Sequence, residues 1–173
     1  MTTRLDFAEF YAASFGRITA QLHAFIGDHA EAQDIVQEAF CRAYARWSTV
    51  STYDSPLAWV RRIAWNMAVS RWRRARLLRA WRRDLVADPL PEPSAVSVDL
   101  ARALARLPPN QRQALVLHYL ADMPVADVAA FVGVAEGTVK AWLHRGRTAL
   151  GGLMADHIDA TATGGNGLGA TDA

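Results

Sequence analysis

The sequence predicts an all-α protein of two small helical domains joined by a flexible linker. Apolar residues recur at helical spacing along most of the 173 residues, and no stretch alternates as a strand would. An acidic, proline-containing segment, residues 84–98, interrupts that pattern. The net charge is only +2, yet residues 60–83 contain no acid and nine arginines: Arg61, Arg62, Arg71, Arg73, Arg74, Arg76, Arg79, Arg82 and Arg83.

The first two helices open with the same signal. Asp6 with Glu9, and Asp28 with Glu31, form D-x-x-E starts of the capping-box type, and Gly27 separates the two helices. The apolar positions of the first helix are Phe7, Phe10, Tyr11, Phe15, Ile18, Leu22, Phe25 and Ile26. Those of the second are Ala32, Ile35, Val36, Ala39, Phe40, Ala43 and Trp47.

The second helix has an acidic outward face. Its members are Asp34, Gln37, Glu38, Cys41 and Ala45. An acidic face repels DNA, so we expect this one to contact protein, with plain solvated surface as the alternative.

A loop, STVSTYDSP, precedes the third helix, which has Asp54 or Ser55 as its N-cap and Pro56 in its first turn. Helical geometry predicts an apolar face of Val60, Ile63, Ala64 and Met67. The opposite face is predicted to contain Arg62, Trp65, Asn66, Val69, Trp72, Arg73 and Arg76. Tryptophans beside arginines are typical of single-strand binding, although one or both could instead pack on a neighbouring helix.

The second domain is expected to start near Asp99 and to contain a helix-turn-helix. A short helix over residues 125–131, a turn at Gly133 and a second helix from Glu136 form it. The predicted inward residues are Val128, Ala129, Val132, Val139, Leu143, Gly146 and Leu150. The predicted DNA-facing residues are Gly137, Thr138, Lys140, Ala141, His144, Arg145, Arg147 and Thr148. Lys140, Arg145 and Arg147 are expected on phosphates, and the alternative is an ordinary helical hairpin with a solvated basic face.

Several classes of protein are not favoured by the composition. A single cysteine, Cys41, allows no intrachain disulfide and fits a reducing cytoplasm. The N-terminus does not have the pattern of a signal peptide, and no apolar run is as long as a membrane span. The five histidines are scattered, so we expect no metal and no cofactor. No catalytic arrangement can be argued from spacing, and we therefore expect no enzyme.

Two parts of the chain together resemble one family. LPPNQRQALVLHYLADMPVADVAAFVGVAEGTVKAWLHRGRTAL resembles region 4 of the extracytoplasmic-function (ECF) group of bacterial sigma factors. DHAEAQDIVQEAFCRAYARW resembles their region 2.2, and SPLAWVRRIAWNMAVSRWRRAR their regions 2.3 and 2.4. AWVRRIAWN and the compact length look most like the actinobacterial SigE-like branch.

The resemblance implies residues 1–83 as region 2, 84–98 as a linker, 99–155 as region 4 and 156–173 as a disordered tail. It implies binding to core RNA polymerase, at the clamp helices of the largest subunit and at the beta subunit, and to promoter DNA, both duplex and single-stranded. An anti-sigma factor is a further candidate partner. The position of Trp142 is commonly Arg in the family, that of Gly146 commonly Ala, and that of Asp127 commonly Glu.

The resemblance also assigns residues to each partner. Core polymerase would contact Asp34, Gln37, Glu38 and Cys41. The minus-ten element would contact Arg62, Trp65, Asn66, Trp72, Arg73 and Arg76. The minus-thirty-five element would contact Gly137, Thr138, Lys140, Ala141, His144, Arg145 and Arg147.

Two other functions stay open at this point. One is a helix-turn-helix regulator that acts without polymerase and whose N-terminal helices dimerise or sense a ligand. The other is an RNA- or single-strand-binding module in which the arginine-rich segment is the whole function.

Overall fold

The computed structural model describes residues 6–81 and 98–164, and the side chains of residues 6–75 and 100–155. Every element in these ranges is helical, which confirms the predicted fold class. The chain divides into two compact units, Met1–Val98 and Asp99–Ala173. The first contains α1 (Phe7–Ile26), α2 (His29–Ala45), α3 (Trp47–Val50) and α4 (Pro56–Trp81). The second contains α5 (Val98–Arg106), α6 (Pro109–Leu115), the π-helical segment η1 (Val116–Leu120), α7 (Val125–Val132) and α8 (Glu136–Gly164).

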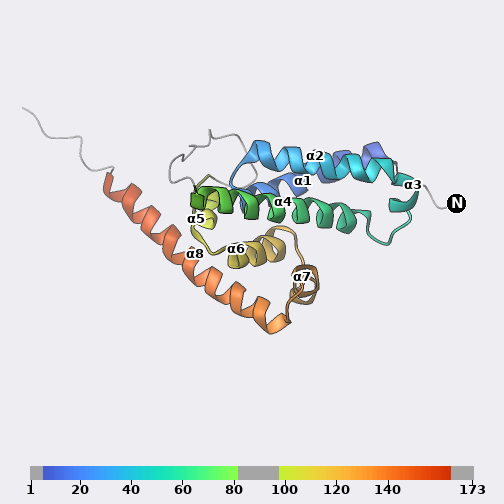
Figure 1. The fold of residues 1–173 in the computed structure, drawn as a ribbon. Coiled ribbons are helices and arrows are strands. Elements are labelled where there is room, and N and C mark those ends of the chain that lie inside the picture. Colours follow the sequence, from blue (N-terminus) through green and yellow to red (C-terminus); the bar gives the residue numbers. More distant parts are fainter. Residues whose placement is uncertain (1–5, 82–97, 165–173) are drawn as a thin grey trace, which may run out of the picture. The chain divides into compact units, whose positions relative to one another are not determined.

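The first unit is a bundle in which α1, α2 and α4 pack on one another (Figure 1). Its core consists of fully buried apolar side chains from the three helices, among them Ile18, Leu22, Ile35, Val36, Phe40 and Val60. This packing gives α2 and α4 one buried and one exposed face each, and the exposed faces are the ones available to partners.

The helix ends of this unit follow the sequence signals with one exception. Asp28 Oδ1 accepts a hydrogen bond from the Glu31 N–H at 3.0 Å, as predicted for the start of α2. Ser55 Oγ accepts from the Ala58 N–H at 3.1 Å and so caps α4. Asp6 is the N-cap residue of α1, but its side chain makes no cap hydrogen bond, so the predicted capping box is wrong there.

The sequence predicted a loop after α2, but part of this segment is helical. Residues 47–50 form the one-turn helix α3, which buries Val50. Trp47 packs with Phe7 and Phe10 at ring-centroid distances of 5.1 Å each. The contact with these two rings explains why a stretch rich in Ser and Thr still makes a helical turn.

The buried face of α4 differs from the predicted one. Val60, Ala64, Trp65 and Ala68 are each 0 % exposed, whereas Ile63 and Met67 are only partly buried. The buried face of α4 is therefore rotated about the helix axis by roughly a quarter of a turn from the predicted apolar face. The small alanines at 64 and 68 allow the other helices to approach closely, and Trp65 packs against Phe25 at a centroid distance of 5.0 Å.

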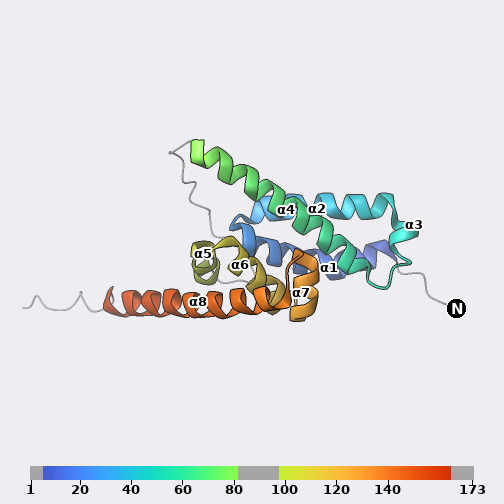
Figure 2. The same cartoon turned by 60° about the horizontal axis from the view of Figure 1, so that its bottom comes forward.

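In the second unit, α6 and α7 both pack on α8. The C-terminal part of α8 extends beyond α6 (Figure 2). Gly133 ends α7 with φ +80°, the left-handed conformation predicted for the turn. Val128, Ala129, Val139 and Leu143 are buried, as predicted. Val132 and Leu150 are half-buried.

At Gly146, α6 and α8 approach each other closely. A Cβ at this position would lie 3.0 Å from Leu115 Cδ1 and 3.3 Å from Gln111 Cβ, which is closer than ordinary van der Waals contact. The absence of a side chain therefore lets α6 pack tightly on α8.

Arg112 has a structural role that the sequence did not indicate. It is 6 % exposed, and its Nη2 donates to the carbonyl oxygens of Ala105 at 3.1 Å and Leu107 at 3.4 Å. These carbonyls lie at the end of α5, so Arg112 ties α6 to α5.

The backbone of α8 continues to Gly164, although residues from 156 onward were predicted to be a disordered tail. This part of the prediction differs from the structure for residues 156–164, where the helix continues and no proline interrupts it. Residues 165–173 lie outside the described residues, as do 82–97, which include almost all of the predicted linker. In the described ranges no helix has both the length and the apolar character needed to span a membrane.

Candidate protein and nucleic-acid interfaces

The outward face of α2 is largely as predicted. Asp34, Gln37, Cys41 and Ala45 are exposed, and Glu38 is half-buried. Gln37 Oε1 accepts a hydrogen bond from the Tyr11 hydroxyl at 2.9 Å, so α1 holds this amide in place.

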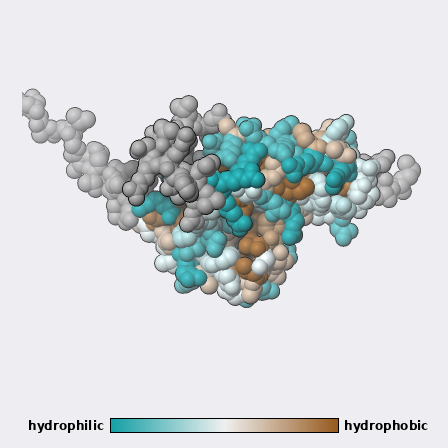
Figure 3. All heavy atoms as spheres, in the orientation of Figure 1, coloured by the Kyte–Doolittle hydropathy of each residue, from teal (hydrophilic) through white to brown (hydrophobic). Residues whose placement is uncertain are grey.

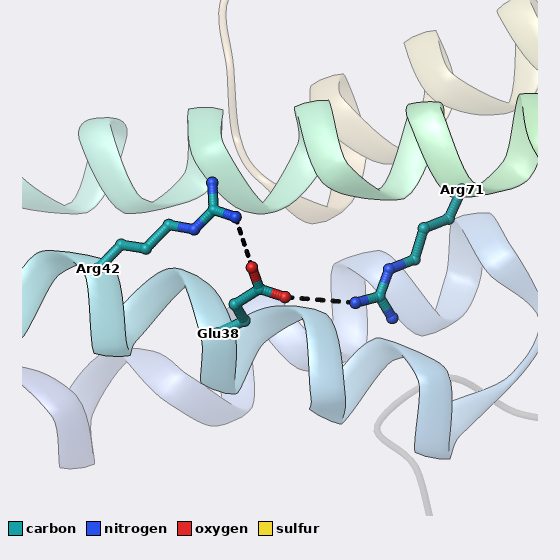
Figure 4. Close-up of polar contacts among 3 residues, drawn as sticks. All are labelled: Glu38, Arg42 and Arg71. Atoms are coloured by element: carbon teal, nitrogen blue, oxygen red, sulfur yellow. Dashed lines mark hydrogen bonds and ion pairs between the residues drawn. The ribbon is translucent and has the colours of Figure 1, made fainter.

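Glu38 links α2 to α4 through an ion pair. Arg42, one turn later on α2, donates to Glu38 Oε1, and Arg71 of α4 donates to Oε2 at 3.3 Å (Figure 4). The Glu38 and Arg71 side chains are 42 % and 39 % exposed, so water weakens the pairing and each group stays accessible to a partner.

A groove of about 410 Å³ runs between α2 and α4 at this point. Its lining residues are Glu38, Arg42, Ile63, Asn66, Met67, Ser70, Arg71 and Arg74. On this side of the unit the surface is mostly hydrophilic, with an apolar patch between hydrophilic stretches (Figure 3). Arg42, Arg71 and Arg74 were not among the predicted site residues, because only the packing of α2 against α4 brings them together.

The predicted minus-ten residues do not all lie on one exposed surface. Arg62, Asn66 and Arg73 are exposed, which fits a strand-binding role. Trp65 is fully buried, so the prediction that it stacks on a base is wrong, and the alternative of packing on a neighbouring helix holds.

Two further residues of that set are less clearly placed on the surface. Trp72 is half-buried, with its ring 6.4 Å from that of Phe25. The side chain of Arg76 lies outside the described residues.

An aromatic surface between α1 and α2 was not anticipated from the sequence. A groove of about 300 Å³ there is lined by Phe7, Tyr11, Gln37, Phe40, Cys41 and Tyr44. Tyr44 is 67 % exposed and its ring lies 4.9 Å from that of Phe7. The groove adjoins the acidic face of α2, since Gln37 and Cys41 belong to both.

In the second unit, α8 presents the predicted polar face. Gly137, Lys140, His144, Arg145, Arg147 and Thr148 are exposed, and Thr138 and Ala141 are half-buried. Lys140 lies 3.9 Å from Glu136, and Arg145 Nε donates to the Ala141 carbonyl oxygen at 3.3 Å. These contacts run along the helix itself, so both cations stay on its surface.

Arg147 is held by another element. Its Nη1 donates to the hydroxyl of Tyr119 in η1 at 3.2 Å. Tyr119 is 49 % exposed, and the pair lies at the edge of the α8 surface.

Neither unit shows a metal centre in its described part. No group of three or more His, Cys, Asp or Glu side chains is placed to hold an ion there. His23 and His29 are neighbours, with ring centroids 5.3 Å apart. Burial, helped by the nearby His29 and opposed by Asp28, lowers the pKa of His23 below its ordinary value of 6.5.

Comparison with known proteins gives two family matches. The model for sigma-70 region 2 matches residues 10–82, and that for sigma-70 region 4 matches residues 97–150. The chain is 30 % identical to the RNA polymerase sigma-E factor of Streptomyces coelicolor, over 91 % of this chain and 92 % of that protein. It is 29 % identical to the ECF RNA polymerase sigma factor SigW of Bacillus subtilis, over 74 % and 78 %.

A solved structure is also similar along nearly its whole length. The sigma factor RpoE of Bartonella quintana, crystallised with the anti-sigma factor NepR, is 25 % identical with a TM-score of 0.72. The match covers 86 % of this chain and 96 % of that one.

Proposed function

The chain belongs to the ECF group of RNA polymerase sigma factors, and on that premise we propose how its two units share the recognition of a promoter. As a sigma factor it binds core RNA polymerase and directs it to promoter DNA. Such proteins are initiation factors without enzymatic chemistry, and we propose that this chain likewise has none and acts in the cytoplasm. A regulator that works without polymerase is not favoured, because region 2 is present as well as region 4.

Region 2, assigned to residues 1–83, would contact polymerase through α2. The proposed contacts are Asp34, Gln37, Glu38 and Cys41, all at least partly exposed on one side of that helix. The clamp helices of the largest subunit are the expected partner of this face. The aromatic groove beside it extends the surface with apolar area that an interface core needs.

The same unit would hold the minus-ten strand on α4. Arg62, Asn66 and Arg73 are exposed there. Arginines supply phosphate contacts, and the Asn66 amide can both donate to and accept from a base edge. The observation that carries the proposal is that α2 and α4 pack in one bundle and expose an acidic and a basic face, respectively.

Region 4, assigned to residues 99–155, would bind the minus-thirty-five duplex through α8, with residues 84–98 as the linker. Lys140, Arg145 and Arg147 would contact phosphates. An anti-sigma factor remains a further proposed partner, since the Bartonella relative was solved with one.

A charge reversal tests the polymerase interface. We expect Asp34→Arg to abolish co-purification with core polymerase while the helical circular dichroism stays unchanged, because Asp34 is exposed. Asp54→Arg is the matched control, since it reverses the charge of another exposed aspartate, before α4. Normal core binding by the Asp34 variant would remove this face from the interface.

A further inference from the structure

We propose that Tyr119 is a positioning residue for DNA binding: it holds Arg147 at the edge of α8 so that both side chains meet one phosphate of the promoter duplex. The proposal rests on the assignment of α8 to duplex DNA made above. Tyr119 lies outside the helix-turn-helix, in η1, and neither the sequence nor the resemblance pointed to it.

The geometry of α8 puts Arg147 where a phosphate contact is expected. Arg147 follows Lys140 by seven residues, about two helical turns, so the two cations lie on the same side of α8. That side borders η1, because the Arg147 guanidinium reaches Tyr119 at 3.2 Å. Cations at the margin of a recognition helix face the sugar–phosphate backbone rather than the base edges.

The position of Tyr119 is itself fixed by its surroundings. The edge of the neighbouring His118 ring lies against it, at a centroid distance of 4.7 Å and an interplanar angle of 68°. His118 is anchored through Nδ1, 2.7 Å from the Met123 carbonyl oxygen. The Ala121 N–H closes the π-helical turn by donating to Val116 O at 3.0 Å. Tyr119 is thus an exposed side chain on a well-held backbone.

The contact at Gly146 brings η1 within reach of Arg147. Gly146 immediately precedes Arg147, and Leu115 immediately precedes η1. A Cβ on Gly146 would be 3.0 Å from Leu115 Cδ1, so these two chain positions lie close together. The π-helical winding that starts at Val116 then changes the direction of Tyr119 from the one an uninterrupted α6 would give it.

The chemistry of the pair suits a phosphate. The Tyr119 oxygen accepts a hydrogen bond from Arg147, which leaves its own O–H to donate to another acceptor. The guanidinium keeps its remaining N–H groups for the same purpose. A phosphate oxygen accepts from both kinds of donor, and fixing an arginine beforehand reduces the side-chain entropy lost on binding.

The test is a double-mutant cycle on the full-length chain. The probe is a 30-base-pair duplex of random sequence, because phosphate contacts do not depend on sequence, and affinity is measured by fluorescence anisotropy over a series of salt concentrations. The variants are Tyr119→Phe, Arg147→Ala and the double variant. Tyr53→Phe is the matched control, as it removes the hydroxyl of another tyrosine of similar exposure, 44 % against 49 % for Tyr119. Lys140→Ala tests the α8 surface independently.

We expect Arg147→Ala to lower the slope of log affinity against log salt by about one unit. Tyr119→Phe, which keeps the ring against His118, should weaken binding by about two- to tenfold, the range for a lost hydrogen bond. In the Arg147→Ala background it should weaken binding much less, and Tyr53→Phe should have no effect.

Three results would overturn the proposal. Tyr119→Phe could bind as the parent does, could bind more tightly, or could lose as much affinity with Arg147 absent as with it present. If Lys140→Ala also leaves affinity and slope unchanged, the assignment of α8 to DNA fails as well. A normal Lys140 effect beside a silent Tyr119→Phe would refute only the role of Tyr119.

Discussion

Replacing Gly146 by alanine sets a gain in helix propensity against a steric cost. In the interior of a helix, alanine is favoured over glycine by about 1 kcal/mol. The new Cβ, however, would lie 3.0 Å from Leu115 Cδ1 and 3.3 Å from Leu115 Cγ. Leu115 is only 3 % exposed and has little room to move, and overpacking of a core costs about 1–3 kcal/mol. We therefore expect Gly146→Ala to reduce the free energy of unfolding of the second unit by about 0–2 kcal/mol.

Gly151→Ala is the matched control for this prediction. Gly151 lies on the same helix, and a Cβ there would meet nothing within 4 Å, so the full propensity gain of about 0.5–1 kcal/mol should appear. Urea unfolding followed through NMR signals of α6 and α8 measures this unit separately from the other one. If Gly146→Ala stabilises as much as Gly151→Ala, the close contact is not a constraint and the reasoning is wrong.

Three further predictions concern the first unit. Trp65→Ala should destabilise it by about 3–5 kcal/mol in a thermal melt, since the indole is buried against Phe25; a small loss would contradict a core role. Asp28→Ala should cost about 1 kcal/mol in urea unfolding because it removes the α2 cap, whereas Asp6→Ala should cost less; equal losses would show that the cap hydrogen bond contributes little. Because folding lowers the pKa of His23, the imidazole is protonated in the unfolded chain before it is in the folded one as the pH falls below 6.5, and the free energy of unfolding should decline there. His23→Gln should flatten this decline. An unchanged pH profile of stability in that variant would contradict the prediction.

The elements of the chain were predictable because local signals specify them. Gly27 and Gly133 end their helices in the left-handed conformation, with φ of +86° and +80°, as their positions after apolar periodic stretches indicated. Most of the predicted inward residues of the helix-turn-helix are buried, and Val132 and Leu150 are half-buried. In α7 and α8 the large residues Val128, Val139 and Leu143 are all buried, and their helical spacing was sufficient to predict the inward face.

The orientation of α4 was not predictable in the same way. The sequence pattern placed Ile63 and Met67 on the apolar face with Ala64 and left out Ala68, whereas Ala64 and Ala68 are the buried residues because other helices pack closely over them. That choice depends on the partners α1 and α2, which no local pattern contains. The same holds for the Glu38–Arg71 pair and the Tyr119–Arg147 pair, whose members lie on different elements.

The shared carboxylate of Glu38 affects how mutants of this protein should be interpreted. A screen for lost transcription could recover substitutions at this position for two unrelated reasons, since Glu38 also pairs with Arg71 of α4, the helix proposed to hold the minus-ten strand. A Glu38 variant that fails would thus be ambiguous between a lost polymerase contact and an altered DNA face. Pairing it with an Arg71 substitution separates the two, because an effect that persists without Arg71 cannot act through α4. Asp34, exposed on the same helix, is the simpler genetic marker for the proposed polymerase surface.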